Sequence, residues 1–181
     1  TILAARTCLL EAVISCIFAP DAQIVFRTDF SVSWTLGYLL GEKLTGLGVG
    51  KIVGPGGKWE PGENAEQAAC REVAEEVGIS LDPRHLTPIA VVEYPFVTRP
   101  ELSQRSHAFI ATRFDGTPTS SPELHPTWWP RTEMPWDAMW ADAKLWLPRA
   151  LEGEFLHASF AIDADNGVAS SQMTWSTLRR S

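Results

Sequence analysis

The sequence has few of the residues that build disulfide frameworks or zinc sites. Its 181 residues include three cysteines and four histidines. The cysteines (Cys8, Cys16 and Cys70) form no C-x-x-C pair, and the histidines show no metal-ligand spacing. An odd number of isolated cysteines argues against a disulfide framework, and the missing pair argues against a zinc knuckle. We therefore expect the histidines to be ordinary surface or core residues.

Positive charge is also scarce. The chain has 15 Lys and Arg against 22 Asp and Glu, a formal net charge of −7. Phosphate backbones are held by Lys and Arg, so polymeric nucleic acid is an unfavourable partner. A small anionic ligand would have to be received by something other than the net surface charge.

Long apolar runs are missing as well. The stretch 2–18 is apolar on average, but Arg6 and Glu11 interrupt it. It is too short and too broken to span a bilayer, and it lacks the basic start and cleavage site of a signal peptide. We therefore expect a cytoplasmic protein with no membrane partner, a monomer in the first instance and a dimer as the alternative.

The order of apolar runs and turn residues predicts a mixed fold. Helical spacing predicts helices over 63–77 and 138–151, the second with Pro148 in its last turn. Short runs bounded by turns predict strands at 13–18, 24–26, 34–40, 89–94 and 108–114, with a turn at 20–22 and a closing hairpin from 155–162 and 172–175. The irregular alternation favours an α/β (α+β) sandwich. Residues 1–37 are expected to supply an early strand, at 13–18 or at 30–36, ahead of one domain over 38–181.

One helix carries an unusual cluster of carboxylates. Glu72, Glu75 and Glu76 lie at i, i+3 and i+4 and so share one face near the end of the helix. Like charges in that position destabilise a helix, and they stand at the wrong end of its dipole. A hard divalent cation such as Mg²⁺ needs this arrangement, because it takes oxygen ligands and bridges carboxylates to substrate phosphates. The alternative is a solvated acidic face.

The residues around this cluster follow a known pattern, G-x5-E-x7-R-E-U-x-E-E-x-G-U, in which U is aliphatic. The pattern is matched in full by Gly57, Glu63, Arg71, Glu72, Val73, Glu75, Glu76, Gly78 and Ile79. The chain thus resembles the Nudix hydrolases, which cleave nucleoside diphosphates linked to another moiety. The resemblance implies a mixed β-sheet sandwiched between α-helices.

The resemblance also implies roles for individual residues. Glu72, Glu75 and Glu76 would bind Mg²⁺, with Mn²⁺ as the alternative, and would activate water, with a backbone carbonyl of Gly56 joining them. Arg71 would hold a carboxylate in a fixed position, supported by Gly57, Glu63 and Gly78. For Arg71 the alternative is a surface ion pair with Glu75.

A narrower likeness runs from Tyr38 onward, to the MutT-type animal members of the family. It lies in Tyr38–Lys43, in the glycine-rich stretch 46–57, and in downstream positions such as Gly116-Thr117-Pro118 and Trp140-x-Asp142. It implies that Glu123 is a further metal ligand, that Trp140 stacks on a purine, that Asp142 hydrogen-bonds the purine edge, and that Lys43 and Lys58 bind substrate. Trp128, Trp136 and Trp146 are expected in the core.

The pocket residues depart from that branch at several positions. Val53 stands where the animal enzymes have asparagine, and Ala143 where they have a second aspartate. Leu47 and Val92 replace phenylalanines. Losing an amide removes both a donor and an acceptor, so we expect base recognition to be rearranged or looser.

The function expected on this basis is Mg²⁺-dependent hydrolysis of oxidised purine nucleoside triphosphates such as 8-oxo-dGTP to monophosphate and pyrophosphate. That would be nucleotide-pool sanitation, a role in DNA repair. Two alternatives stay open. One is a pyrophosphatase for ADP-ribose, a nucleotide sugar or a dinucleoside polyphosphate. The other is a non-catalytic Nudix domain that senses nucleotides.

Overall fold

The computed structural model describes residues 10–28 and 31–177, with side chains from residue 37 onward. Its strands form one mixed sheet in the order β3-β2-β1-β5-β4-β7-β8, with β6 paired to β2. The β1–β5 and β4–β7 pairs are parallel and the others antiparallel. The strands are β1 (Leu10–Thr28), β2 (Ser31–Lys43), β3 (Ile52–Val53), β4 (Leu86–Tyr94), β5 (Gln104–Ala111), β6 (Leu124–Pro130), β7 (Glu154–Ile162) and β8 (Val168–Thr177).

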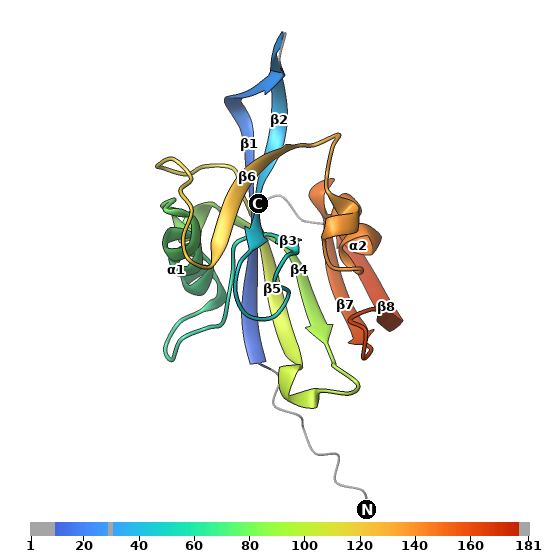
Figure 1. Cartoon of the computed structure of the whole chain (residues 1–181). Helices are drawn as coiled ribbons and strands as arrows, with labels where there is room; N and C mark the ends of the chain where they lie inside the picture. The colour runs from blue at the N-terminus through green and yellow to red at the C-terminus, as the bar shows by residue number, and fades with distance from the viewer. Residues whose placement is uncertain (1–9, 29–30, 178–181) are drawn as a thin grey trace, which may run out of the picture.

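Two α-helices cover opposite sides of this sheet, α1 (Ala65–Val77) and α2 (Ala143–Leu151) (Figure 1). Strand β2 shows how the two sides are separated, because successive side chains of a strand point to opposite faces. Leu39 packs with Val73 and Val77 of α1, whereas Tyr38 and Leu40 belong to the cluster that includes Trp146 of α2. The expected sandwich of a mixed sheet between helices is confirmed.

Local signals explain where α1 begins and ends. Asn64 caps the helix: its side chain accepts the Gln67 N–H, and the Gln67 side chain accepts the Asn64 N–H. The helix ends at Gly78, whose φ of 70° is left-handed and whose N–H donates to the Ala74 carbonyl. The helix therefore starts two residues later than predicted, at Ala65.

The first strands differ from the prediction. The turn expected at 20–22 is wrong, because β1 continues through it with a register irregularity between Ala19 and Ile24. The pairing of β1 with β5 ends at Ile17. The irregular segment of β1 beyond Ile17 therefore costs no hydrogen bonds to β5. Of the two candidate early strands, 13–18 lies in β1 and 31–36 in β2; residue 30 lies outside the described residues. The division at residue 37 stays a prediction, and β2 runs across it.

Two further elements are shifted from their predicted positions. Strand β5 covers 104–111 rather than 108–114, because the polar Gln104 and Ser106 hide the alternation at its start. Helix α2 begins at Ala143 rather than 138 and follows a 3-10 turn, Trp136–Ala138. Pro148 lies inside α2, and the closing hairpin β7–β8 is confirmed.

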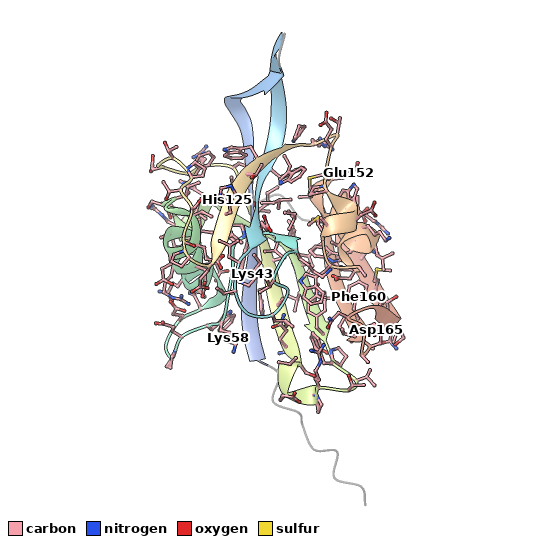
Figure 2. The ribbon with its side chains drawn as sticks, viewed as in Figure 1. Lys43, Lys58, His125, Glu152, Phe160 and Asp165 are labelled. Atoms are coloured by element: carbon pink, nitrogen blue, oxygen red, sulfur yellow. The ribbon has the colours of Figure 1, made fainter. Side chains whose placement is uncertain are left out.

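The candidate site lies where several of these elements meet. Strands β3 and β6 both pair with the end of β2, and the segment 54–64 leads from β3 into α1. In the view of Figure 2, Lys43 lies between α1 and α2, and Lys58 lies below Lys43. No helix in the ranges 10–28 and 31–177 is long and apolar enough to cross a membrane.

Candidate active site

Arg71 organises the acidic face of α1. Its guanidinium grips Glu63 with two hydrogen bonds of 2.8 and 3.0 Å. The same group donates to Glu72 at 2.9 Å, to Glu75 at 3.1 Å and to the Lys58 carbonyl at 2.9 Å. The planar fork of arginine suits such multiple recognition. The ion pair between Arg71 and Glu75 is present. It is one contact in a network through which Arg71 holds the segment from Lys58 to Glu63 against α1.

Gly57 allows the loop to approach α1 closely. A Cβ atom at this position would lie 2.4 Å from Oε1 of Glu72, a separation that real atoms do not adopt. Any side chain at position 57 would therefore push the Glu72 carboxylate away. This contact explains in physical terms why the motif begins with glycine.

Glu76 is the most enclosed carboxylate of the cluster, with 4% of its side chain exposed. Its Oε2 accepts the backbone N–H of Gly56 at 2.8 Å, and its Oε1 lies 3.4 Å from Nζ of Lys43. Glu75, in contrast, is 61% exposed. The three carboxylates of the helix face are therefore in three different environments. Glu72 and Glu76 are the two that contact the glycine turn formed by Gly56 and Gly57.

Burial and hydrogen bonds shift the pKa values of these carboxylates in different directions. Desolvation raises the pKa of Glu72, against the opposing effect of Arg71. Desolvation also raises the pKa of Glu76, against the Gly56 N–H and Lys43, and the negative charge of Glu123 adds to the rise. The hydrogen bond from Arg71 lowers the pKa of Glu63, which stays a carboxylate. A negative charge on Glu72 or Glu76 therefore carries a desolvation cost in the folded protein, and a bound cation would offset that cost.

The donor set suits a hard divalent cation, because Glu72 and Glu76 offer carboxylate oxygens beside one turn. Within the described residues, no group of three His, Cys, Asp or Glu side chains is placed so that it could hold a metal. Glu75 is turned to Arg71, and Glu123 is exposed just before β6. The metal roles of Glu72, Glu75, Glu76, Glu123 and the Gly56 carbonyl stay predictions.

A cavity of about 480 Å³ opens beside the glycine turn. Its wall is mostly apolar and comes from β2, β3, β4, β5 and the α2 region. The predicted substrate residues Lys43, Lys58, Trp140 and Asp142 all line it, together with Gly56 and Gly57. The structure thus gathers in one cavity residues that lie up to a hundred positions apart in the chain.

Two donors hold Asp142 in this cavity. Its Oδ2 accepts the hydroxyl of Tyr94 at 2.8 Å and the indole N–H of Trp146 at 2.9 Å, and the residue is 3% exposed. Burial raises the pKa of the Tyr94 phenol well above its usual range, so Tyr94 stays a donor. Asp142 occupies the N-cap position of α2, but its side chain makes no capping hydrogen bond, because the carboxylate is turned to these partners.

Trp140 is held from the side of the glycine-rich loop. Nζ of Lys51 lies 5.3 Å from the centre of the indole ring and 3.4 Å from the Met139 carbonyl. A Cβ at Gly48, whose φ is 85°, would come within 2.9 Å of the indole. The loop therefore packs directly on Trp140, which positions a flat aromatic group at the cavity wall.

Sequence reasoning missed several of these residues. Trp146 was expected only in the core, and it is buried, but it also donates to Asp142; the i, i+4 spacing of the pair is the signal that could have shown this. Trp128 and Trp136 are half-buried rather than fully buried. Tyr94, Gln104 and Ser106 enter the site only through strand pairing, and no local signal marks them.

Comparison with known proteins places this site in a family. The NUDIX domain family matches residues 38–150. The match covers the carboxylate helix, the glycine turn and the cavity residues of β4, β5 and α2. The chain belongs to the Nudix family of hydrolases.

Individual relatives narrow the comparison. The chain is 41% identical over 114 residues to the oxidized purine nucleoside triphosphate hydrolase of Danio rerio, covering 63% of this chain and 71% of the relative. It is 40% identical to the protein of that name from Mus musculus over the same shares. Among solved structures, the MutT protein of Bacillus halodurans has a TM-score of 0.70 with 20% identity, covering 91% of this chain and 97% of that one. This last likeness shows the fold.

Proposed function

We propose that this chain hydrolyses oxidised purine nucleoside triphosphates, such as 8-oxo-dGTP, to nucleoside monophosphate and pyrophosphate. One observation carries the proposal: a single cavity connects Trp140 and Asp142 to the glycine turn beside Glu72 and Glu76. A nucleotide has a flat base at one end and phosphates at the other. It would therefore place its base at Trp140 and Asp142 and its phosphates at the glycine turn. The relatives named as oxidized purine nucleoside triphosphate hydrolases support the choice of substrate.

At the phosphate end, Glu72, Glu75 and Glu76, with the Gly56 carbonyl and Glu123, would hold Mg²⁺ or Mn²⁺. When bound, such an ion neutralises phosphate charge and lowers the pKa of a coordinated water. Arg71 keeps Glu72 and Glu75 in place through its hydrogen bonds. Lys43 lies between Glu76 and the cavity and adds positive charge where phosphates would lie.

At the base end, Trp140 offers an aromatic face for stacking. Asp142 has one oxygen engaged by Tyr94 and Trp146, and among the described residues no donor is bonded to its other oxygen. That second oxygen is an acceptor for an N–H on the edge of a base. The two donors fix its direction, which a recognition group needs.

The cavity also bears on the oligomeric state and the size of ligand that we propose. The lining residues that the structure describes come from a single chain, and we take a monomer as the working unit. Its volume of about 480 Å³ suits a small molecule rather than a nucleic-acid polymer. Work on the nucleotide pool would place the protein in the cytoplasm.

A substrate panel at a fixed Mg²⁺ concentration tests the proposal. We expect kcat/KM, measured by pyrophosphate release, to be highest for 8-oxo-dGTP or 2-oxo-dATP and lower for dGTP. ADP-ribose, scored by AMP release, represents the other hydrolase class. If ADP-ribose alone is turned over, the proposal is wrong. Specific nucleotide binding without turnover of any of these compounds would favour a sensor.

A further inference from the structure

Strand β5 brings two polar side chains into the wall of the cavity. Gln104 and Ser106 are two positions apart on β5 and therefore face the same side of the sheet. Their surroundings in the cavity are largely apolar, with Phe96, Leu102 and Ile162 among the lining residues. Polar groups on such a wall usually serve to orient a ligand.

Ser106 has an unusual feature that points to a ligand. The residue is 1% exposed, and among the described residues no hydrogen-bond partner is found for its Oγ. A buried hydroxyl without a partner destabilises the protein, because it has lost its bonds to water. A bound molecule that fills the cavity can satisfy it when the Ser106 side chain turns toward the cavity, and the hydroxyl can both donate and accept.

Strand pairing places this serine near the carboxylate of the base end. In the β4–β5 register, Gln104 lies opposite Tyr94, and Ser106 lies opposite Val92. Ser106 is thus the diagonal neighbour of Tyr94, whose hydroxyl is bonded to Asp142. Asp142 accepts hydrogen bonds, whereas Ser106 and Gln104 can donate them.

Two other positions of the cavity wall supply no such groups. Val53 and Ala143 both line it, and neither side chain can form a hydrogen bond. Apart from the two lysines and the tryptophans, the polar side chains that line the cavity among the described residues are Tyr94, Gln104, Ser106 and Asp142, and the Tyr94 hydroxyl is already bonded to Asp142. Ordinary base pairs are distinguished by such donor and acceptor patterns.

We propose that Ser106, assisted by Gln104, determines base specificity by donating to a purine carbonyl while Asp142 accepts the N–H beside it. This inference rests on the proposed function for the identity of the substrate. Ser106 acts together with the carboxylate of Asp142, which can only accept, and the pair selects purines that present a carbonyl next to an N–H, as guanine and 8-oxo-guanine do. The 6-amino edge of adenine presents the reverse pattern.

Ser106→Ala tests the proposal. We expect kcat/KM for 8-oxo-dGTP and dGTP to fall about tenfold through KM, while the value for dATP stays within about twofold. The melting temperature should hold or rise by about 2 °C, because the unpartnered hydroxyl is gone. Gln104→Met should act in the same direction, with a loss of about threefold. A loss shared equally by all three substrates, or a lower melting temperature with unchanged base preference, would overturn the proposal.

Ser159→Ala is the matched control. Ser159 is a half-buried strand serine that lines a separate shallow hollow with Val91 and Glu93, on the other face of the sheet. Its replacement should leave the preference among bases unchanged. A shift in that preference equal to the one in Ser106→Ala would overturn the assignment to Ser106.

Binding measurements keep the two proposals separate. If the wild-type protein turns over no purine triphosphate, the proposed function fails, and calorimetry with dGMP and dAMP then decides the role of Ser106. Weaker binding of dGMP alone in Ser106→Ala supports that role. Equal changes for both ligands, or no binding of dGMP to the wild-type protein, would contradict it.

Discussion

The two ends of the cavity are built in different ways. At the carboxylate end, one stretch from Gly57 to Gly78 supplies a dense set of ion pairs around Arg71. At the base end, Tyr94, Ser106, Asp142 and Trp146 come from β4, β5 and the α2 region, with few charges and mostly apolar neighbours. The first end contains the chemistry shared by a family. The second is assembled from single side chains that lie far apart in the chain.

The carboxylate end should give the largest effect. Glu76→Gln removes the charge of the most enclosed carboxylate, and we expect kcat/KM to fall about a thousandfold. The loss should be the same for every base, because the proposed function places the base at the other end of the cavity. Steady-state kinetics over the substrate panel measures it.

Glu66→Gln is the control for that variant, since Glu66 lies in the first turn of the same helix. It makes the same change of charge and should retain activity within about twofold, the effect of an ordinary surface substitution. A base-dependent loss in Glu76→Gln would break the distinction between the two ends.

The base end should give a smaller and selective effect. Tyr94→Phe removes one of the two donors that hold Asp142. We expect about a tenfold rise in KM for 8-oxo-dGTP with kcat retained, because Tyr94 positions Asp142 without touching the phosphates. Trp146→Phe removes the other donor and should change KM in the same direction.

Kinetic constants for both variants, measured with 8-oxo-dGTP and dATP, check this. A fall in kcat with KM unchanged would mean that Tyr94 acts on the chemical step. An equal effect on the two nucleotides would show that it contributes to packing alone.

The smallest expected effect is the pH dependence of stability. Burial raises the pKa of Glu76 above its ordinary value of 4.5, so the folded protein binds this proton more tightly than the unfolded chain does. Stability from this group is therefore present at low pH and is lost as the pH rises through the raised pKa. Without divalent ions, the melting temperature of Glu76→Gln relative to wild type should increase by about 1–2 °C from pH 4.5 to 7.

Thermal melts in chelator at a series of pH values measure this difference, and adding Mg²⁺ at pH 7 should reduce it by stabilising the wild type alone. A difference that is flat with pH would show that Glu76 has the same proton affinity in both states.

Much of the fold could be predicted because its signals are local. The Asn64 cap, the helical spacing through Val73 and the left-handed Gly78 define α1 within a few residues. The hairpin β7–β8 follows from its turn, where Asn166 has a φ of 61°. Predictions failed where tertiary contacts decide: β1 passes through Pro20 as a strand, and the polar start of β5 conceals its role in the cavity.

By itself, the sequence determined the class of chemistry. The spacing from Gly57 to Ile79 places Glu72 and Glu76 on one helix face and allows the glycine turn to approach them, and both depend on neighbours in the chain. Only the tertiary structure decided what lies at the base end. Asp142 meets Tyr94 across 48 positions, and Ser106 reaches the same cavity through strand register. Such contacts depend on how distant elements pack, which no local pattern records.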